Sequence, residues 1–316
     1  MFQLEYDKLI IGVGAENNTF GIPGVKEHTH FLRQLADARA IQRRIIECFE
    51  RASIPTVPTD ERKRLLNFVI VGGGPTGVEF ATELSDFFWE DLNKYYPTIP
   101  VSDVRITLLE AGKTILNAFN SRLVERAMKS IRMQGIDIRT EAFVKEVKKD
   151  VVVMTDGSEI KCGLIVWNTG ISPLPLVSKL PTPKSKSGRI LVNHYFQLPD
   201  YPEVYAVGDC AQIDGMPLPA TGAVAEKQGA HAAKTLNEFA QNKTPTKFDW
   251  MPFGMMTYIG TNQSLIQTSW TQGAGHFEWF VWRSVYMTSL GSLKNKLQVP
   301  VNWMRTLIWG RDITDF

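Results

Sequence analysis

The chain has 316 residues, enough for two domains, and its 44% content of hydrophobic residues suffices for a sizeable core. Its net charge of +2, without a run of basic residues, gives no indication of a nucleic-acid partner. The three cysteines, Cys48, Cys162 and Cys210, are far apart in the sequence and form no C-x-x-C, so we expect no local redox dithiol and no zinc site. We interpret His28 and His30 as capping or surface residues rather than metal ligands.

The first predicted element is a strand over residues 7–13, which runs into glycines. No charged-then-apolar signal pattern precedes it, so the chain is expected to open directly within a fold. A turn-rich link then leads to a helix. Its apolar residues recur at three- and four-residue spacing, at Phe31, Leu35, Ala38, Ile41, Ile45 and Phe49. Residues 53–64 form a polar, proline-punctuated connection.

The stretch FVIVGGGPTGVEFATEL, residues 68–84, predicts a dinucleotide-binding turn. A buried strand leads into it and a helix begins at Pro75. Between them Gly72, Gly74 and Gly77 have G-x-G-x-x-G spacing. They allow a tight turn, approach of the pyrophosphate to the backbone, and close packing of helix on strand.

A second predicted strand, residues 104–109, ends in Glu110, which is placed to hydrogen-bond a ribose hydroxyl. A carboxylate rather than an arginine at this point favours NADH over NADPH. The gap from the glycine loop to Glu110 exceeds the usual ~20 residues, so we expect an insertion over residues 87–100 to bulge out of the unit. A glycine-rich turn without a ligand is the alternative.

The order of the remaining elements predicts a compact nucleotide-binding domain followed by a separate region. An amphipathic helix stops at Gly135, and strands and a hairpin turn at Asp156-Gly157 follow, closing with a buried strand. The expected strands are residues 136–138, 143–147, 151–154 and 164–167. Beyond them we expect an exposed loop over 173–188, a strand over 204–207 and a helix over 221–239.

The character of the chain changes from Phe248 onward. Aromatic and basic residues alternate there, at Trp279, Trp282, Arg283, Lys294, Lys296, Trp303, Arg305, Trp309 and Arg311. Such helices suit a membrane interface, although a dimer interface or an ordinary aromatic core is also consistent with the pattern. No stretch of 18 apolar residues occurs, so no segment is expected to span a bilayer.

Several segments together resemble the type II NADH dehydrogenases, the single-chain, non-proton-pumping NADH:quinone oxidoreductases. They run nearly end to end and are YDKLIIGVGAENNTFGIPGV, FLRQLADARAIQRRI, VGGGPTGVEFATEL, VWNTG, YAVGDCA, LPATGAVAEKQGAHAAKTLN and WRSVYMTSLGSLKNKLQVPVNWMRTLIWGRDITDF. The inserted segment FFWEDLNKYYP resembles the corresponding segment in the mitochondrial branch of the family, which is found in eukaryotes.

The resemblance implies an α/β flavoprotein fold with two nested Rossmann-like units, as in glutathione reductase, and a C-terminal amphipathic membrane anchor. It divides the chain into a remnant of the FAD domain with a linker helix (1–64), an NADH-binding Rossmann domain (65–172), a returning FAD-domain segment (173–247) and a membrane-anchoring or dimerisation region (248–316). It also implies a peripheral location on the mitochondrial inner membrane, as a homodimer or within a larger respiratory complex.

The resemblance also assigns roles to residues. NADH would be held by Gly72, Gly74, Pro75, Thr76, Gly77 and Glu110, with Thr169 and Gly170 on the nicotinamide side. Glu79 matches a family glutamate near the flavin and quinone, where a buried carboxylate could tune proton chemistry or receive protons. Its alternative role is to stabilise a helix N-terminus. Gly208 and Asp209 match a Gly-Asp dipeptide of the family, in which the aspartate accepts a hydrogen bond from the FAD ribityl chain.

The sequence also departs from the family pattern. Members start with a βαβ unit that cradles the FAD pyrophosphate, which we expect this chain to lack, so it is expected to hold FAD poorly. The two quinone-facing glutamines of A-Q-x-x-x-Q are replaced by Ala223 and Lys227, and Asn168 stands where alanine is usual. The second hypothesis is therefore a catalytically degenerate structural subunit of a respiratory assembly. A third, a sulfide:quinone or disulfide reductase, would need paired cysteines near the flavin.

Overall fold

The computed structural model describes residues 2–251, 254–311 and 313. The chain divides into two compact units. Unit 1 comprises residues 1–18 and 170–252, and unit 2 comprises residues 19–169 and 253–316. Each unit has its own hydrophobic cores, so each is described by itself.

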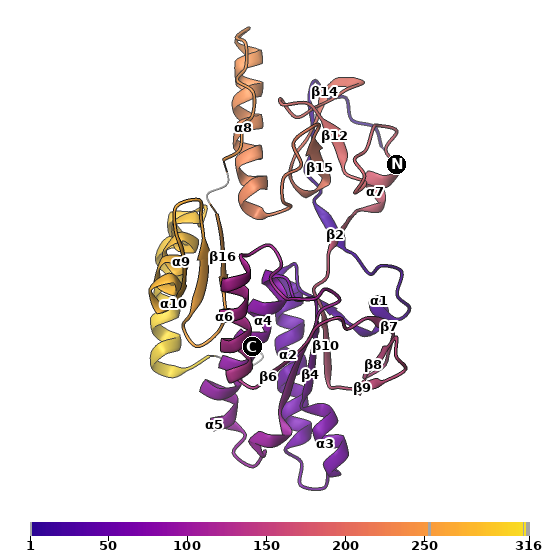
Figure 1. The fold of residues 1–316 in the computed structure, drawn as a ribbon. Coiled ribbons are helices and arrows are strands. Elements are labelled where there is room, and N and C mark those ends of the chain that lie inside the picture. The colour runs from indigo at the N-terminus through magenta and orange to yellow at the C-terminus, as the bar shows by residue number, and fades with distance from the viewer. Residues whose placement is uncertain (1, 252–253, 312, 314–316) are drawn as a thin grey trace. The chain divides into compact units, whose positions relative to one another are not determined.

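Unit 2 is built on a five-stranded parallel sheet of order β3-β10-β4-β5-β6 (Figure 1). Its strands are β3 (His30–Phe31), β4 (Asn67–Val71), β5 (Arg105–Leu109), β6 (Ile136–Arg139) and β10 (Leu164–Trp167). All the pairings between neighbours are parallel. The central strands are apolar almost throughout because both faces of the sheet are covered.

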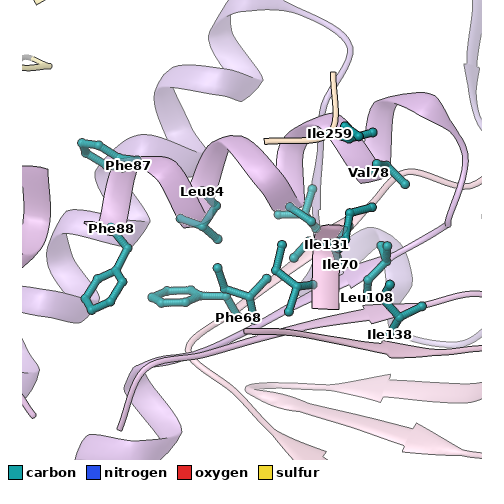
Figure 2. Close-up of a cluster of buried hydrophobic side chains, with 14 of the residues drawn as sticks. Phe68, Ile70, Val78, Leu84, Phe87, Phe88, Leu108, Ile131, Ile138 and Ile259 are labelled. Carbon is teal, nitrogen blue, oxygen red and sulfur yellow. The ribbon is translucent and has the colours of Figure 1, made fainter. Parts of the chain in front are cut away.

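Side chains of β4 alternate between the two faces of this sheet. Phe68 and Ile70 join a core with three helices, α2 (Leu35–Ala52), α4 (Pro75–Phe87) and α6 (Ser121–Met133). Figure 2 shows Phe68, Ile70 and Leu108 of the sheet beneath Val78 and Leu84 of α4. On the other face, Val69 and Val71 join a second core.

That second core is closed by an antiparallel sheet of order β7-β8-β9. Its strands are β7 (Val144–Lys148), β8 (Val151–Met154) and β9 (Glu159–Lys161). The predicted Asp156-Gly157 turn lies between β8 and β9, and Gly157 has φ +86°, which favours glycine. The short helix α1 (Val25–His28) adds Val25 to this second core, whereas α3 (Thr59–Leu65) adds Leu65 to the first.

The insertion over residues 87–100 does not bulge out as expected. Helix α4 continues through a π-helical turn, Phe88–Leu92, into α5 (Asn93–Tyr95). Phe88 and Leu92 are 5% and 0% exposed, and the ring of Phe88 lies 6.0 Å from that of Phe49. The prediction was wrong because the apolar residues of the insertion extend the core instead of leaving it.

The C-terminal part of unit 2 is a three-stranded antiparallel sheet followed by two helices. The elements are β16 (Met255–Tyr258), β17 (Ser264–Gln267), β18 (Gln272–Gly275), α9 (His276–Ser289) and α10 (Leu293–Trp309). Ile259, Leu265 and Ala274 pack into the core shared with α4 and α6. Of the helices described, none combines the length and apolar character needed to cross a bilayer.

Unit 1 is a small α/β body with its own core. Its strands are β1 (Leu9–Ile11), β2 (Ala15–Asn17), β11 (Ile171–Pro173), β12 (Ile190–Val192), β13 (Gln197–Leu198), β14 (Tyr201–Ala206) and β15 (Ala211–Ile213). They form a β1-β14-β13 sheet and the pairs β11-β2 and β12-β15. The helices are α7 (Pro175–Lys179) and α8 (Gly222–Ala240). The exposed loop predicted over 173–188 is corrected here, because it contains α7, whose Val177 is fully buried.

Candidate functional site

The glycine loop between β4 and α4 has the conformation that its sequence predicts. Gly72 has φ +113°, and its N–H donates to the Leu109 carbonyl at 2.8 Å. A Cβ on Gly77 would collide with the carbonyl oxygen of Gly72, so helix and loop approach too closely for any side chain. A Cβ on Gly74, by contrast, would meet no described atom within 4 Å. The loop therefore leaves open space at the position expected for a pyrophosphate.

The N-terminus of α4 faces this space with free polar groups. Gly74 is the N-cap, and within the described chain no side chain caps the helix. Pro75 and Thr76 are exposed at its first turn. The leading N–H groups of a helix lack intrahelical acceptors and carry partial positive charge, which makes this end an anion site. These residues fit a dinucleotide diphosphate.

Glu110 lies at the end of β5 beside the loop. Its Oε2 accepts a hydrogen bond from the Gly73 N–H at 2.6 Å, and its Oε1 accepts one from the Gly112 N–H at 2.6 Å. The carboxylate therefore ties the glycine loop to the next strand, a role that sequence reasoning missed. Each oxygen keeps acceptor capacity for a ribose hydroxyl.

The carboxyl end of β10 also reaches the loop. The Asn168 N–H donates to the Val71 carbonyl at 2.8 Å, and a Cβ on Gly72 would lie 3.1 Å from the Thr169 methyl group. Asn168 Nδ2 is buried and makes no hydrogen bond to the residues described. Gly170 follows with φ +49° at the start of the next segment of unit 1. Thr169, to which the resemblance assigns the nicotinamide side, thus lies next to the glycine loop.

Glu79 lies further along α4 in a polar contact with the C-terminal sheet. Its Oε1 accepts hydrogen bonds from the Thr257 hydroxyl at 3.2 Å and from the Tyr258 N–H at 3.1 Å. Burial raises the pKa of the carboxyl to about 6, and the hydrogen bonds from Tyr258 and Thr257 oppose this shift. A carboxyl of this pKa can both hold and release a proton near neutral pH.

A cavity of about 430 Å³ in unit 2 opens beside Glu79, and we name it the α2–α4 cavity. Its walls are mainly apolar and come from α2, α4 and the C-terminal part of the chain. The lining residues are Leu32, Ala38, Ile41, Gln42, Ile45, Thr76, Glu79, Phe80, Glu83, Leu84, Phe87, Tyr258, Trp282 and Arg311. An apolar cavity with few polar groups is typical of a small-molecule site.

Arg311 holds the end of the chain near this cavity. Its guanidinium forms ion pairs with Glu83 at 2.9 Å, Glu90 at 2.7 Å and Asp91 at 2.8 Å. Its backbone N–H also donates to Asp91 at 3.2 Å. The sequence suggested a cation facing lipid at this position. The structure instead uses it to join the segment after α10 to α4 and the π-helical turn.

Gly208 and Asp209 lie in unit 1 after β14, and Asp209 is half-buried. The Gly208 N–H donates to Oε1 of Gln228 at 2.7 Å, and Gln228 is 3% exposed. Gln228 therefore fixes this turn from α8. Sequence reasoning missed that role and noted only that Gln228 is adjacent to the altered position Lys227.

Those altered positions, Ala223 and Lys227, are both exposed on α8. They are four positions apart and so share a face of the helix. Lys227 Nζ lies 5.1 Å from the ring centroid of Trp250, a cation–π contact. A cation thus occupies a position at which the resemblance implies a neutral amide.

The residues present fit an FAD only in part. Gly208 and Asp209, which the resemblance matches to the ribityl chain, follow β14 in unit 1. Over residues 2–18 and 170–251, however, β1 leads into β2, and no second glycine-rich strand–turn–helix is found there to hold a diphosphate. Within the described residues, a site that fits a dinucleotide diphosphate is therefore observed at the start of α4.

The cysteines do not form a redox pair in the part of the chain that is described. Cys48, Cys162 and Cys210 are all free and buried. Burial raises the pKa of Cys48 to about 11 and that of Cys162 to about 12, which keeps both thiols neutral and unreactive at pH 7. Among the residues described, no group of three or more His, Cys, Asp and Glu side chains could hold a metal ion.

Comparison with protein families gives two matches that together cover most of the chain. The family of pyridine nucleotide-disulphide oxidoreductases matches residues 1–229. The NDH2 C-terminal domain matches residues 253–312. The boundary near residue 253 coincides with the return of the chain to unit 2.

Two curated relatives align over nearly the whole chain. A probable NADH dehydrogenase of Dictyostelium discoideum is 48% identical, and the alignment covers 100% of this chain and 70% of the relative. The mitochondrial internal alternative NAD(P)H-ubiquinone oxidoreductase A1 of Arabidopsis thaliana is 36% identical, with 99% and 65% covered. The chain thus spans about two thirds of the length of these relatives.

A solved structure shares the fold. NDH2 from Plasmodium falciparum, in complex with NADH, superimposes with a TM-score of 0.92 at 22% identity, covering 99% of this chain and 80% of that one. At this identity the match shows the fold alone.

Proposed function

Because this chain belongs to the pyridine nucleotide-disulphide oxidoreductases and, among them, to the type II NADH:quinone oxidoreductases, we propose that it oxidises NADH with a quinone as the electron acceptor. The observation that carries the proposal is the glycine loop. Gly74 leaves its space open, Gly77 packs against Gly72, and the end of α4 is without a side-chain cap in the described chain. This combination fits a dinucleotide diphosphate.

The loop and Glu110 would bind and orient the coenzyme. Gly72, Gly74, Pro75, Thr76 and Gly77 would present the diphosphate to the backbone N–H groups at the start of α4. Binding here fixes the rest of the dinucleotide relative to the protein, which supplies part of the rate enhancement through orientation.

Glu110 would select the unphosphorylated coenzyme. Its carboxylate is already held by two backbone N–H groups, so it cannot easily turn away from the ribose. A ribose hydroxyl can donate to it, whereas a 2′-phosphate would be repelled. Thr169 and Gly170 would lie on the nicotinamide side, since the Thr169 methyl group lies 3.1 Å from the point where a Cβ on Gly72 would stand.

The FAD characteristic of the family supplies, when bound, an acceptor for hydride from NADH and a donor of electrons to quinone. Of the residues described, Gly208 and Asp209 would meet its ribityl chain, with Gln228 holding the turn. Glu79 would hold and release a proton at its carboxyl as the quinone is reduced, because its pKa of about 6 lies near the working pH.

We further propose that α9 and α10 bind a membrane surface, peripherally and on the mitochondrial inner membrane. Relatives carry mitochondrial names, and α10 exposes an apolar stripe at helical spacing, made of Leu293, Leu297, Val301, Met304 and Ile308. Lys294, Lys296 and Arg305 lie on the same helix and would meet anionic lipid. A homodimer or a larger respiratory complex would use the same stripe.

The proposal is tested by titration calorimetry of the full chain with NADH and NADPH, together with flavin content and NADH oxidation by a short-chain ubiquinone. We expect NADH to bind more tightly than NADPH and to be oxidised by the quinone in material that carries flavin. Absence of NADH binding to folded protein would overturn the proposal. NADH binding without turnover in flavin-loaded material would favour a structural subunit, in line with the changes at Ala223 and Lys227.

A further inference from the structure

Trp282 carries a polar group whose position is unexplained by the contacts around it. The residue lies on α9 and lines the α2–α4 cavity together with Glu79. Its indole Nε1 is buried and has no hydrogen-bond partner in residues 2–251, 254–311 and 313. Buried polar groups are nearly always paired, so this donor calls for a specific acceptor. An indole N–H can only donate.

The position of the ring is fixed by aromatic stacking. The Trp282 ring stacks on Tyr258 with centroids 5.7 Å apart and planes at 28°, and it lies 4.8 Å from the ring of Tyr286. Tyr258 is also the residue whose backbone N–H donates to Glu79. Trp282 and Glu79 therefore pack against the same residue, from α9 on one side and α4 on the other.

The Glu79 carboxyl is the candidate acceptor for this indole, since it lines the same cavity and both residues pack against Tyr258. The indole lowers the pKa of this carboxyl, in the same direction as the hydrogen bonds from Tyr258 and Thr257. The two groups do not form a hydrogen bond of standard geometry, since Nε1 has no partner among the residues described. A small rotation of either side chain, of the kind that accompanies binding in a cavity, would complete it.

We propose that Trp282 is a positioning residue for Glu79: its indole N–H is directed at the Glu79 carboxylate and holds it at the wall of the α2–α4 cavity. The catalytic meaning of this contact rests on the function proposed for Glu79, whereas the contact itself does not. Helix α9 also exposes Phe277 and Phe280, which are 75% and 65% exposed. A single helix thus carries both a candidate lipid-facing surface and the residue that orients Glu79.

Other titratable groups lie around the Glu79 carboxyl, and a test of Trp282 must leave these residues unchanged. Glu83 and Asp86 lie on the same helix, Tyr258 belongs to β16, and Tyr286 belongs to α9 and is coupled to the charge of Glu79. Arg311 reaches the cavity from the segment after α10. None of them is altered by replacing Trp282, so a change in the titration of Glu79 would report the indole.

The decisive measurement is a pH titration of the full chain labelled with ¹⁵N at its tryptophan indoles, followed by NMR. Of the eight tryptophans, we expect the Trp282 signal to move with a midpoint of about 6, the pKa of Glu79, and to stop moving in Glu79→Gln. The signal is assigned by its absence in Trp282→Phe, or by its contacts to the Tyr258 ring if that variant does not fold.

The second measurement follows the infrared band of the protonated Glu79 carboxyl, identified as the band lost in Glu79→Gln. In Trp282→Phe, which keeps a ring for stacking, we expect its midpoint to rise by about half a pH unit or more because a donor to the charged form is lost. Trp279→Phe is the control, since the Trp279 ring contacts Arg283 at 4.7 Å, and it should leave the midpoint unchanged.

An indole signal that does not depend on Glu79, or an unchanged carboxyl midpoint in folded Trp282→Phe, overturns the proposal. Both readouts are independent of NADH oxidation, so this failure is distinguishable from failure of the proposed function, which is measured by NADH binding and turnover on the same preparation.

Discussion

Oε1 of Glu79 accepts a hydrogen bond from the backbone N–H of Tyr258 at 3.1 Å, across 179 positions of sequence. The hydroxyl of Thr257 donates to the same oxygen at 3.2 Å. This contact joins α4, which begins at the glycine loop, to strand β16 of the C-terminal part of unit 2. Because the carboxyl is buried there, its pKa is raised from 4.5 to about 6. Its protonation is therefore linked to folding.

We predict that Glu79 makes the protein less stable as the pH rises through this range. Below pH 4.5 the carboxyl is protonated in both the folded and unfolded states, so no penalty arises. Between pH 4.5 and 6 the Glu79 carboxyl is ionised in the unfolded state but still largely protonated in the folded state, so the free energy of unfolding falls as the pH rises. The total loss, reached above pH 6, is at most about 2 kcal/mol. Chemical denaturation of wild type and Glu79→Gln at pH 4.5, 5.5 and 7.5 measures the difference.

In Glu79→Gln the amide oxygen can still accept from Thr257 and Tyr258, so the fold should persist and this component of the pH dependence should vanish. The variant should be more stable than wild type at pH 7.5 while its quinone reduction falls. Glu125→Gln, an exposed position on α6, is the control and should follow wild type. Parallel stability profiles for wild type and Glu79→Gln would contradict the prediction.

The glycine loop offers a pair of substitutions that separate binding from folding. In Gly74→Ala the new methyl group meets no described atom, so stability should change by less than about 1 kcal/mol. It would occupy the space for the diphosphate, so the Kd for NADH should rise by about tenfold or more, equivalent to ~1.4 kcal/mol. Calorimetric titration with NADH and denaturant unfolding measure the two effects.

Gly77→Ala is the matched contrast. Its methyl group collides with the Gly72 carbonyl, so α4 must move away from β4. We expect a loss of stability of about 1–3 kcal/mol as well as weaker NADH binding. The glycine loop would have another role if Gly74→Ala bound NADH as wild type does.

The contrast between the loop and Glu79 shows what the sequence could predict. The loop is local: strand, Gly72, Gly77 and helix are adjacent in the chain, so spacing alone predicted this strand–turn–helix. Most of the strands that were predicted lie within about two residues of the observed ones, whereas β16, β17 and β18 were not predicted. The polar environment of Glu79 depends on Thr257 and Trp282, which are distant in sequence, and no periodicity indicates such a contact.

The errors have a similar physical origin. The insertion was expected to bulge out because its length exceeded the usual connection, whereas the burial of Phe88 and Leu92 is decided by tertiary packing against Phe49. Arg311 was grouped with lipid-facing cations because local composition cannot reveal three carboxylates more than two hundred positions earlier. Gln228 was passed over because its partner, Gly208, is not a neighbour in the chain.

Glu110→Gln tests the choice of coenzyme. The amide can accept only one of the two backbone hydrogen bonds from Gly73 and Gly112, and its N–H₂ group faces the other donor. The charged hydrogen bond proposed between the ribose hydroxyl and the Glu110 carboxylate would also be lost. Such a loss costs about 1.5–3 kcal/mol, so NADH should bind more weakly by about tenfold or more. Discrimination against NADPH should fall at the same time because the repelling charge is gone. An unchanged NADH-to-NADPH ratio of Kd values would exclude Glu110 from selection.

Arg311→Gln tests how the C-terminal segment is held. Asp91 has a side chain only 4% exposed and would keep its charge with no guanidinium beside it. Because Arg311 is itself partly exposed, at 24%, we expect a moderate loss of about 1–3 kcal/mol in the free energy of unfolding. Lys296→Gln, on the exposed face of α10, is the control. Equal midpoints for both variants in denaturant would show that the ion pairs contribute nothing to stability.

The apolar stripe of α10 predicts binding to lipid. Leu297 and Met304 are 64% and 63% exposed, and burying such a side chain is worth about 1.5–3 kcal/mol. Leu297→Ser and Met304→Ser should therefore each weaken sedimentation with anionic vesicles by about tenfold or more. Leu176→Ser, a 56% exposed leucine of α7 in unit 1, should not. Dimer contacts and lipid would cover the same exposed side chains of α10. If the α10 variants convert a dimer to a monomer and leave vesicle binding unchanged, the stripe is therefore a protein interface and the lipid prediction is wrong.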